Sequence, residues 1–129
     1  MELDLGFILV GEDMDGTRAD LTDAGPATVI PVDQDTFFEG EGPFEQGEHA
    51  GWVHGTAVLT HRDRLVCQLT FTFESDPEDS IVVHGVLPRE DTGTGPGVLA
   101  VTGGTGRFHK AAGTLKVETR NPKRYSFTL

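Results

Sequence analysis

A cluster of glycines after an apolar run is the pattern with the most direct chemical meaning in this chain. Residues 97–102 lead into Gly103, Gly104 and Gly106. Closely spaced glycines after a strand cradle phosphates when the next segment is a helix whose N-terminus faces the anion. Here no helical pattern follows, because residues 114–119 alternate as a strand does. The pattern therefore predicts a tight glycine corner between two strands, in place of a nucleotide site.

The histidines and the single tyrosine are the next candidates for chemistry. No two histidines lie two residues apart on one predicted strand or beside the cysteine, so we expect no metal site. His84 stands in an apolar strand and is expected to be buried, either as a hydrogen-bonded core residue or as a general acid or base. Tyr125 could donate a hydrogen bond to a substrate carbonyl or have a structural role.

The one cysteine and an acidic loop have simpler interpretations. Cys67 excludes an internal disulfide, and its place in a strand pattern predicts a buried, inert thiol. Asp13, Asp15, Thr17 and Asp20 resemble a calcium loop, but the glycine is misplaced and the twelfth-position glutamate is missing. They are interpreted as loop residues.

Composition excludes several classes of partner. The chain of 129 residues holds 21 acidic and 10 basic side chains, for a formal charge of -11. A field of that sign repels phosphate backbones and anionic membranes, so neither nucleic acid nor a membrane is expected as a partner. No run of about 18 apolar residues occurs and no basic segment precedes an apolar one, which predicts a cytoplasmic protein. The length suits a single domain over residues 1–129.

The elements that must position any site are short strands. Seventeen glycines, seven prolines and brief apolar runs between turn signals indicate an all-β domain. Eight antiparallel strands are expected at residues 5–10, 27–38, 51–61, 64–74, 80–87, 97–102, 114–119 and 124–129. Eight strands that close on themselves leave no open edge and enclose room for side chains or one small ligand, so we predict an eight-stranded antiparallel β-barrel.

Alternation along the strands predicts which side chains face the lumen. In the fourth strand one face is uniformly apolar, and it consists of Leu65, Cys67, Leu69, Phe71 and Phe73. In the third strand, an inward Ala57 would place Trp52, His54 and Thr56 outside. The first strand is apolar on both faces, with Leu5, Phe7 and Leu9 opposite Ile8 and Val10. Such a strand must be covered on both sides, by an oligomer interface or by a loop packed outside.

From about residue 51 to the C-terminus the chain resembles the barrel shared by allene oxide cyclases and plant dirigent proteins. The segments that carry the resemblance are residues 69–73 (LTFTF), 81–85 (IVVHG), 99–108 (LAVTGGTGRF), the pair Ala112-Gly113 and residues 125–129 (YSFTL). The resemblance implies an eight-stranded barrel whose lumen folds a flexible reactive intermediate into one productive conformation. It also implies a homo-oligomer, a trimer or a dimer.

The resemblance does not extend to the catalytic residues of allene oxide cyclases. Their glutamate, asparagine and proline fall on Leu9, Gly11 and Arg18, and their lumen cysteine falls on Ala57. An inward asparagine of the second strand corresponds to Gln34. Allene oxide cyclase activity itself is therefore not expected, and no cofactor is expected.

The inward faces that remain are apolar, which predicts a lumen that binds one small lipophilic molecule. Holding such a molecule in a near-attack shape can accelerate ring closure with little acid–base machinery. The function predicted is a cofactor-free cyclase or conformational template, acting by cycloaddition or spirocyclisation in specialised metabolism. The alternatives are a noncatalytic carrier of a lipophilic ligand and an assembly protein that uses its outer apolar faces. The expected lining residues are Phe7, Leu9, Val32, Gln34, Ala57, Leu69, Phe71 and Tyr125, with Gln34 and Tyr125 as hydrogen-bond donors.

Overall fold

The computed structural model describes residues 6–12, 25–90, 93–119 and 122–129. Their elements are β1 (Gly6–Gly11), β2 (Val29–Glu39), β3 (Gln46–Leu59), β4 (Arg64–Phe73), β5 (Ser80–Glu90), β6 (Gly93–Thr94), β7 (Gly97–Thr105), the 3-10 turn η1 (Gly106–Phe108), β8 (Gly113–Glu118) and β9 (Arg124–Thr128). Leu5 of the first predicted strand lies outside the described residues, as do Asp13 to Asp20 of the acidic loop.

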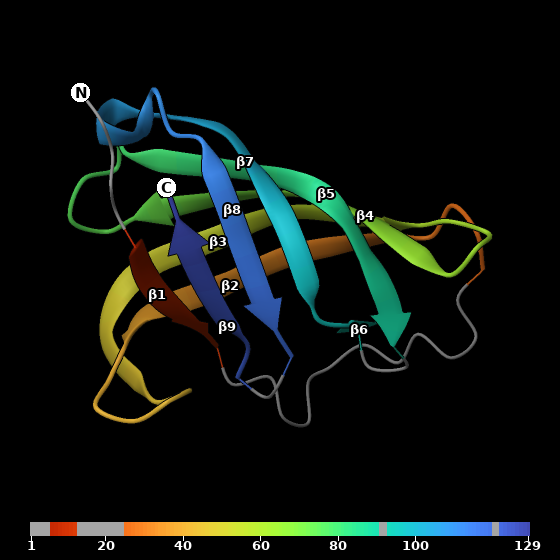
Figure 1. Ribbon diagram of the computed structural model, residues 1–129, viewed down its shortest axis with the longest axis horizontal. Coiled ribbons are helices and arrows are strands. Elements are labelled where there is room, and N and C mark those ends of the chain that lie inside the picture. Colours follow the sequence, from red (N-terminus) through yellow and green to blue (C-terminus); the bar gives the residue numbers. More distant parts are fainter. Residues whose placement is uncertain (1–5, 13–24, 91–92, 120–121) are drawn as a thin grey trace.

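The strands form a closed antiparallel barrel (Figure 1). Their order is β4-β3-β2-β1-β9-β8-β7-β5-β6, and a further pairing of β4 with β5 closes the ring. β6 lies outside the ring as a two-residue extension that pairs only with the end of β5 in the described part of the chain. The predicted eight-stranded β-barrel is thus confirmed, and all eight predicted strands correspond to ring strands.

The two walls of the barrel differ in length. Strands β2 to β5 have 10 to 14 residues, whereas β1, β8 and β9 have five or six. β1 pairs with β2 only from Leu9 opposite Phe38 to Gly11 opposite Thr36. The first half of β2 therefore extends past the end of β1, as Figure 1 shows. The strands surround the bore fully over only part of its length.

The glycine segment forms the predicted tight corner, with η1 at its centre. Gly106 has a φ of 62°, which favours glycine, and a Cβ there would lie 2.2 Å from Oδ1 of Asp79. The Asp79 carboxylate accepts the backbone N–H of Arg107 at 2.9 Å and its Nε at 2.6 Å. These hydrogen bonds hold the pKa of Asp79 below its usual value. A carboxylate of the protein itself is thus the anion that this corner holds.

The outer face of β1 is buried at Val10 and partly exposed at Ile8. Val10 has no exposed surface, yet it lies outside the core cluster. Phe37 and Arg124 stand opposite it in the two neighbouring ladders. The guanidinium of Arg124 pairs with Glu39 and lies 5.9 Å from the ring centroid of Phe44, in the β2–β3 loop. An external loop or an oligomer interface over the rest of this face stays a prediction.

Candidate functional site

Phenylalanine rings fill the end of the bore that carries η1. Phe7 stacks on Phe127 with ring centroids 4.7 Å apart, and it meets Phe73 edge-on at 6.3 Å. Phe73 stacks on Phe108 of η1 at 5.5 Å. Phe71 meets Phe127 edge-on at 5.0 Å and marks the inner limit of this aromatic cluster. Toward the β3–β4 turn the bore is lined by smaller apolar side chains, and Ala57, Leu59, Leu65 and Leu87 are buried there as well.

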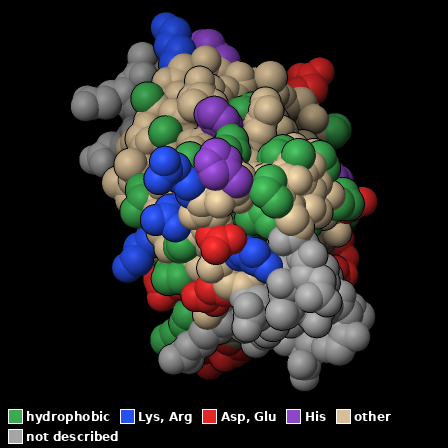
Figure 2. Space-filling view, turned by 90° about the vertical axis from the view of Figure 1, so that its right-hand side faces the viewer, with side chains coloured by type: hydrophobic (Ala, Val, Ile, Leu, Met, Phe, Trp, Pro, Cys, Tyr) green, Lys and Arg blue, Asp and Glu red, His purple; other side chains and the backbone are tan. Residues whose placement is uncertain are grey.

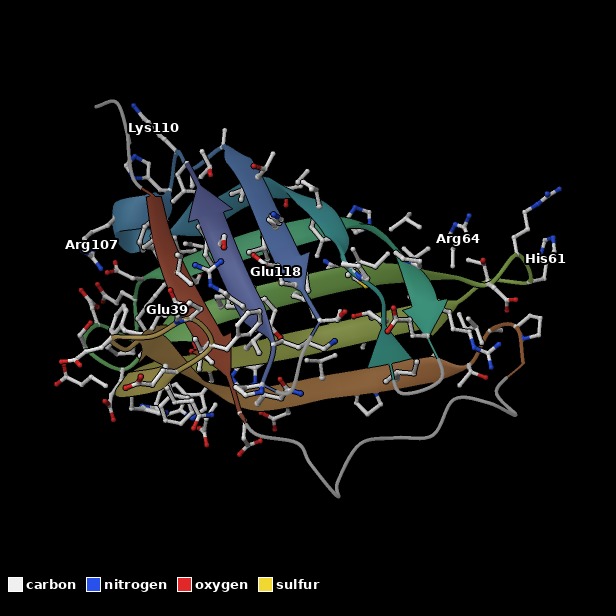
Figure 3. The ribbon with its side chains drawn as sticks, turned by 60° about the horizontal axis from the view of Figure 1, so that its bottom comes forward. Glu39, His61, Arg64, Arg107, Lys110 and Glu118 are labelled. Carbon is white, nitrogen blue, oxygen red and sulfur yellow. The ribbon has the colours of Figure 1, made fainter. Side chains whose placement is uncertain are left out.

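Basic side chains lie at both ends of the barrel. Figure 3 places Arg107 and Lys110 beside η1, and His61 and Arg64 at the β3–β4 turn at the other end. Figure 2 shows that second end, where Lys, Arg and His side chains lie beside hydrophobic ones. Arg89 joins the turn through an ion pair with Asp63 at 3.0 Å.

The inner wall of β2 forms one side of the half that the aromatic cluster leaves. The ladder places Val32 opposite Gly55 and Gln34 opposite Val53 of β3. Paired residues share a face, and Val53 is fully buried, so Val32 and Gln34 face inward. Both keep intermediate exposure, as does Ile30. Within the described residues, no strand pairs with this half of β2 on the β1 side.

Two hydrogen-bonding side chains converge on this wall. A Cβ at Gly11 would lie 3.4 Å from Cε2 of Tyr125 and 3.5 Å from Oε1 of Gln34. Both side chains therefore lie beside Gly11, where the lack of a Cβ leaves room for them. Burial raises the pKa of the Tyr125 hydroxyl, so it remains a protonated donor at neutral pH. The pair can hold a carbonyl or hydroxyl group of a guest beside an apolar surface.

A thiol and an ammonium group complete the surroundings. Cys67 is 2% exposed and stands opposite Ala57 in the β3–β4 ladder. Burial raises the pKa of its thiol, and the positive charge of Lys123 opposes that rise. The thiol thus stays neutral and weakly nucleophilic, which agrees with the predicted inert cysteine. The Lys123 ammonium donates a hydrogen bond to Oγ1 of Thr94 in β6 at 2.7 Å.

The structure places the predicted lining residues on the inner face of the barrel, in two groups. Phe7 and Phe71 belong to the aromatic cluster. Those around the half nearer the β3–β4 turn are Val32, Gln34, Ala57, Leu69 and Tyr125, while Leu9 is fully buried opposite Tyr125 in the β1–β9 ladder. Sequence reasoning missed Lys123, although it lies two residues before Tyr125 and so shares its face.

The expectation for His84 is wrong. Its side chain is exposed on the outer face of β5, because Val83 beside it points inward and is fully buried. His84 stands opposite Gln68 and Ala100, which are exposed as well. It is therefore neither a core histidine nor an acid or base for the lumen.

Three further observations concern the described residues. A shallow groove of about 580 Å³ lies along β1 and β9 and is lined by Gly6, Phe7, Ile8, Phe38, Glu39, Ser126, Phe127 and Thr128. Within the described ranges, no three His, Cys, Asp or Glu side chains are grouped so as to hold a metal ion. The same ranges contain no helix with the length and apolar character needed to cross a membrane.

Fold and site together define a small antiparallel β-barrel with an apolar inner wall and a few polar groups. Its fold is similar to that of pyocyanin demethylase, with a TM-score of 0.61 and 16% sequence identity over 95% of this chain and 97% of the other. At that identity the likeness shows the fold alone. No family model matches the sequence, and no curated protein sequence matches it.

Proposed function

We propose that this barrel binds one small lipophilic molecule against the inner wall of β2 to β4 and acts on it as a cofactor-free cyclase or conformational template. The reaction would be an intramolecular ring closure such as a cycloaddition or spirocyclisation. The wall holds the reactive chain in a compact shape, and Gln34 and Tyr125 orient its polar group.

The observation that carries this proposal is the partly exposed inner face of β2. Rings of the aromatic cluster pack one half. In the other half Ile30 and Val32 face inward with intermediate exposure, next to the hydrogen-bonding side chains of Gln34 and Tyr125. An apolar surface with a few convergent polar groups is the usual character of a small-molecule site.

Two likenesses support the proposal. The resemblance of the chain, from about residue 51 to the C-terminus, to allene oxide cyclase and dirigent barrels points to control of a ligand's shape. The similar fold of pyocyanin demethylase, whose name says that it demethylates pyocyanin, shows a barrel of this form in an enzyme. A noncatalytic carrier of a lipophilic ligand is the alternative, because the same wall would serve both.

Binding can be tested with all-trans-retinol, a neutral lipophilic fluorophore. We expect a saturable rise in its fluorescence at about one probe per chain. The variant Val32→Trp fills the inner wall and should weaken binding about tenfold or more. Val86→Trp is the matched control, since Val86 is 53% exposed on the outer face of β5. Circular dichroism melts check that both variants fold.

Unchanged retinol affinity in folded Val32→Trp would remove the proposed site, and so would a wild-type protein without saturable binding. Turnover separates the two functions. A cyclase incubated with linear polyene substrates changes the ring stereochemistry of the products, whereas a carrier leaves the products unchanged.

A further inference from the structure

One wall of the barrel lacks charged side chains over most of its length. Residues 49–61, 65–73, 80–88 and 93–106 contain no Asp, Glu, Lys or Arg, although these residue types make up 24% of the chain. The four segments include β7 and most of β3, β4 and β5, which are neighbours in the ring. The inward faces of these strands are apolar because they form the core, but the outward faces have no such requirement. An uncharged outer wall in a chain with a formal charge of -11 therefore needs its own explanation.

A row of valines crosses the outer face of this wall at one level. This valine row consists of Val29, Val58, Val66, Val86 and Val98, with one residue each from β2, β3, β4, β5 and β7. The first four pair directly with one another in the ladders. Val98 lies two residues before Ala100, which pairs with His84, so the same antiparallel register places Val98 level with Val86. Neighbouring strands lie about 4.8 Å apart, and the row is therefore about 19 Å long.

The valine row is exposed, although burial of valine side chains is favourable. Val29 and Val98 are each 58% exposed, and Val86 is 53% exposed. They are three of the four large hydrophobic side chains that are exposed among the described residues. The next level of the same outer face is also uncharged and consists of Pro31, Thr56, Gln68, His84 and Ala100. A continuous exposed apolar surface of this kind indicates a site of contact with another molecule.

Charge determines which partner fits this wall. A basic protein would bind the acidic surfaces elsewhere on the chain more strongly than an uncharged one, because opposite charges attract. Two copies of this chain, in contrast, repel each other through a formal charge of -11 each. That repulsion is weakest where the facing surfaces carry no charged side chain. The uncharged wall is thus the surface on which a second copy fits best, and a two-fold axis would bring the same surface of both copies together.

We propose that the valine row is the contact between two copies of this chain, which form a two-fold dimer. Val66 is the middle residue of the row, and in the dimer it lies next to Val66 of the partner subunit. The outer surface of a barrel is convex, so the contact covers only a few strands and buries less than the roughly 1,600 Å² of a standard interface. The dimer is therefore weak, with a Kd on the order of 10–100 µM. The contact lies outside the bore, and the inference is independent of the proposed function.

The test measures the oligomeric state by sedimentation velocity at chain concentrations from about 5 to 500 µM. Wild-type protein should shift from monomer to dimer over this range. Val66→Asp and Val66→Lys should each remain monomeric, because the two-fold contact brings like charges together. An equal mixture of the two variants should dimerise again, because the introduced charges are then opposite.

Thr128→Asp is the matched control for the added charge. Thr128 is exposed on β9, which lies across the ring from β4, so this variant should dimerise as wild-type protein does. Circular dichroism melts check that every variant folds. If the Val66 variants melt early, Val86→Asp and Val86→Lys replace them, since Val86 is more exposed and lies on the neighbouring strand.

Four outcomes would overturn the proposal. Wild-type protein that stays monomeric up to about 500 µM has no such contact. Dimers that persist equally in Val66→Asp would place the contact on another face. A mixture of the two charged variants that stays monomeric would show that the valine row does not pack on itself. Equal loss of the dimer in Thr128→Asp would assign the effect to net charge.

Discussion

Replacing Phe71 with alanine tests whether aromatic rings hold one half of the bore closed. Phe71 has no exposed surface, and it meets Tyr125 edge-on at 5.2 Å and Phe127 at 5.0 Å. Phe71→Ala removes the ring at the inner limit of the aromatic cluster, next to the proposed site.

The expected loss of stability follows from burial and cavity formation. Truncating a fully buried phenylalanine costs about 3–5 kcal/mol, of which edge-on ring pairs account for roughly 0.5–1.5 kcal/mol each. For a chain of 129 residues this corresponds to a fall in Tm of roughly 10 °C or more. The same change enlarges the site next to Tyr125, so bulkier lipophilic probes should bind the variant better than they bind wild-type protein.

Urea unfolding, monitored by far-UV circular dichroism, measures the loss in the free energy of unfolding. Probe fluorescence measures the affinity of the variant for bulkier probes. Val86→Ala is the control, because Val86 is largely exposed and should lose less than about 0.5 kcal/mol. A loss below about 1 kcal/mol for Phe71→Ala would show that the ring is not packed. The tight packing of aromatic rings in this half of the bore would then be wrong.

Two further predictions concern the glycine corner. Gly106→Ala should lower the free energy of unfolding in urea by about 2 kcal/mol or more, because residue 106 has a positive φ and the new Cβ would meet Asp79. Gly25→Ala is the control and should be nearly neutral, because a Cβ there has nothing within 4 Å. Equal effects of the two substitutions would contradict this prediction. Because Arg107 holds the pKa of Asp79 low, the resulting stability is fully present above the unfolded pKa of about 4 and is lost as pH falls through the lower, folded value. Asp79→Asn should therefore flatten the decline of the urea midpoint between about pH 4 and pH 2, and parallel curves for variant and wild type would refute the assignment.

The barrel and its inward faces could be predicted because alternation has a period of two. In β4, every second residue from Leu65 to Phe73 is apolar, and a one-residue slip would expose the whole set. The inward direction of Ala57 in β3 came from the resemblance, in which the family's lumen cysteine falls on that position, and Ala57 is buried in the core. β5 gave no such signal, since Ile81, Val82 and Val83 are all apolar. His84 was therefore assigned to the wrong face.

Contacts between residues far apart in the sequence could not be predicted from the sequence. Glu39 and Arg124 are 85 residues apart, and nothing local links them. Their ion pair nevertheless joins the end of β2 to β9, where Arg124 stands opposite Val10. Lys123 was missed for another reason. It lies one residue before the predicted last strand, so alternation was not extended to it, although the β1–β9 ladder does extend there.

The position of the proposed site depends on strand length and stagger, more than on the composition of any strand. At about 3.3 Å per residue, the four to nine additional residues of β2 to β5 extend that wall more than about 10 Å beyond β1, β8 and β9. Where both walls are present, aromatic rings meet across the bore and fill it. Where only the long wall continues, Val32 of β2 keeps intermediate exposure, although Leu59, Leu65 and Leu87 of β3 to β5 are buried. Alternation along a strand predicts which face each residue occupies. The stagger between neighbouring strands determines which strand ends lie at the same height in the barrel, and this stagger follows only from the pairing of the strands in the closed ring.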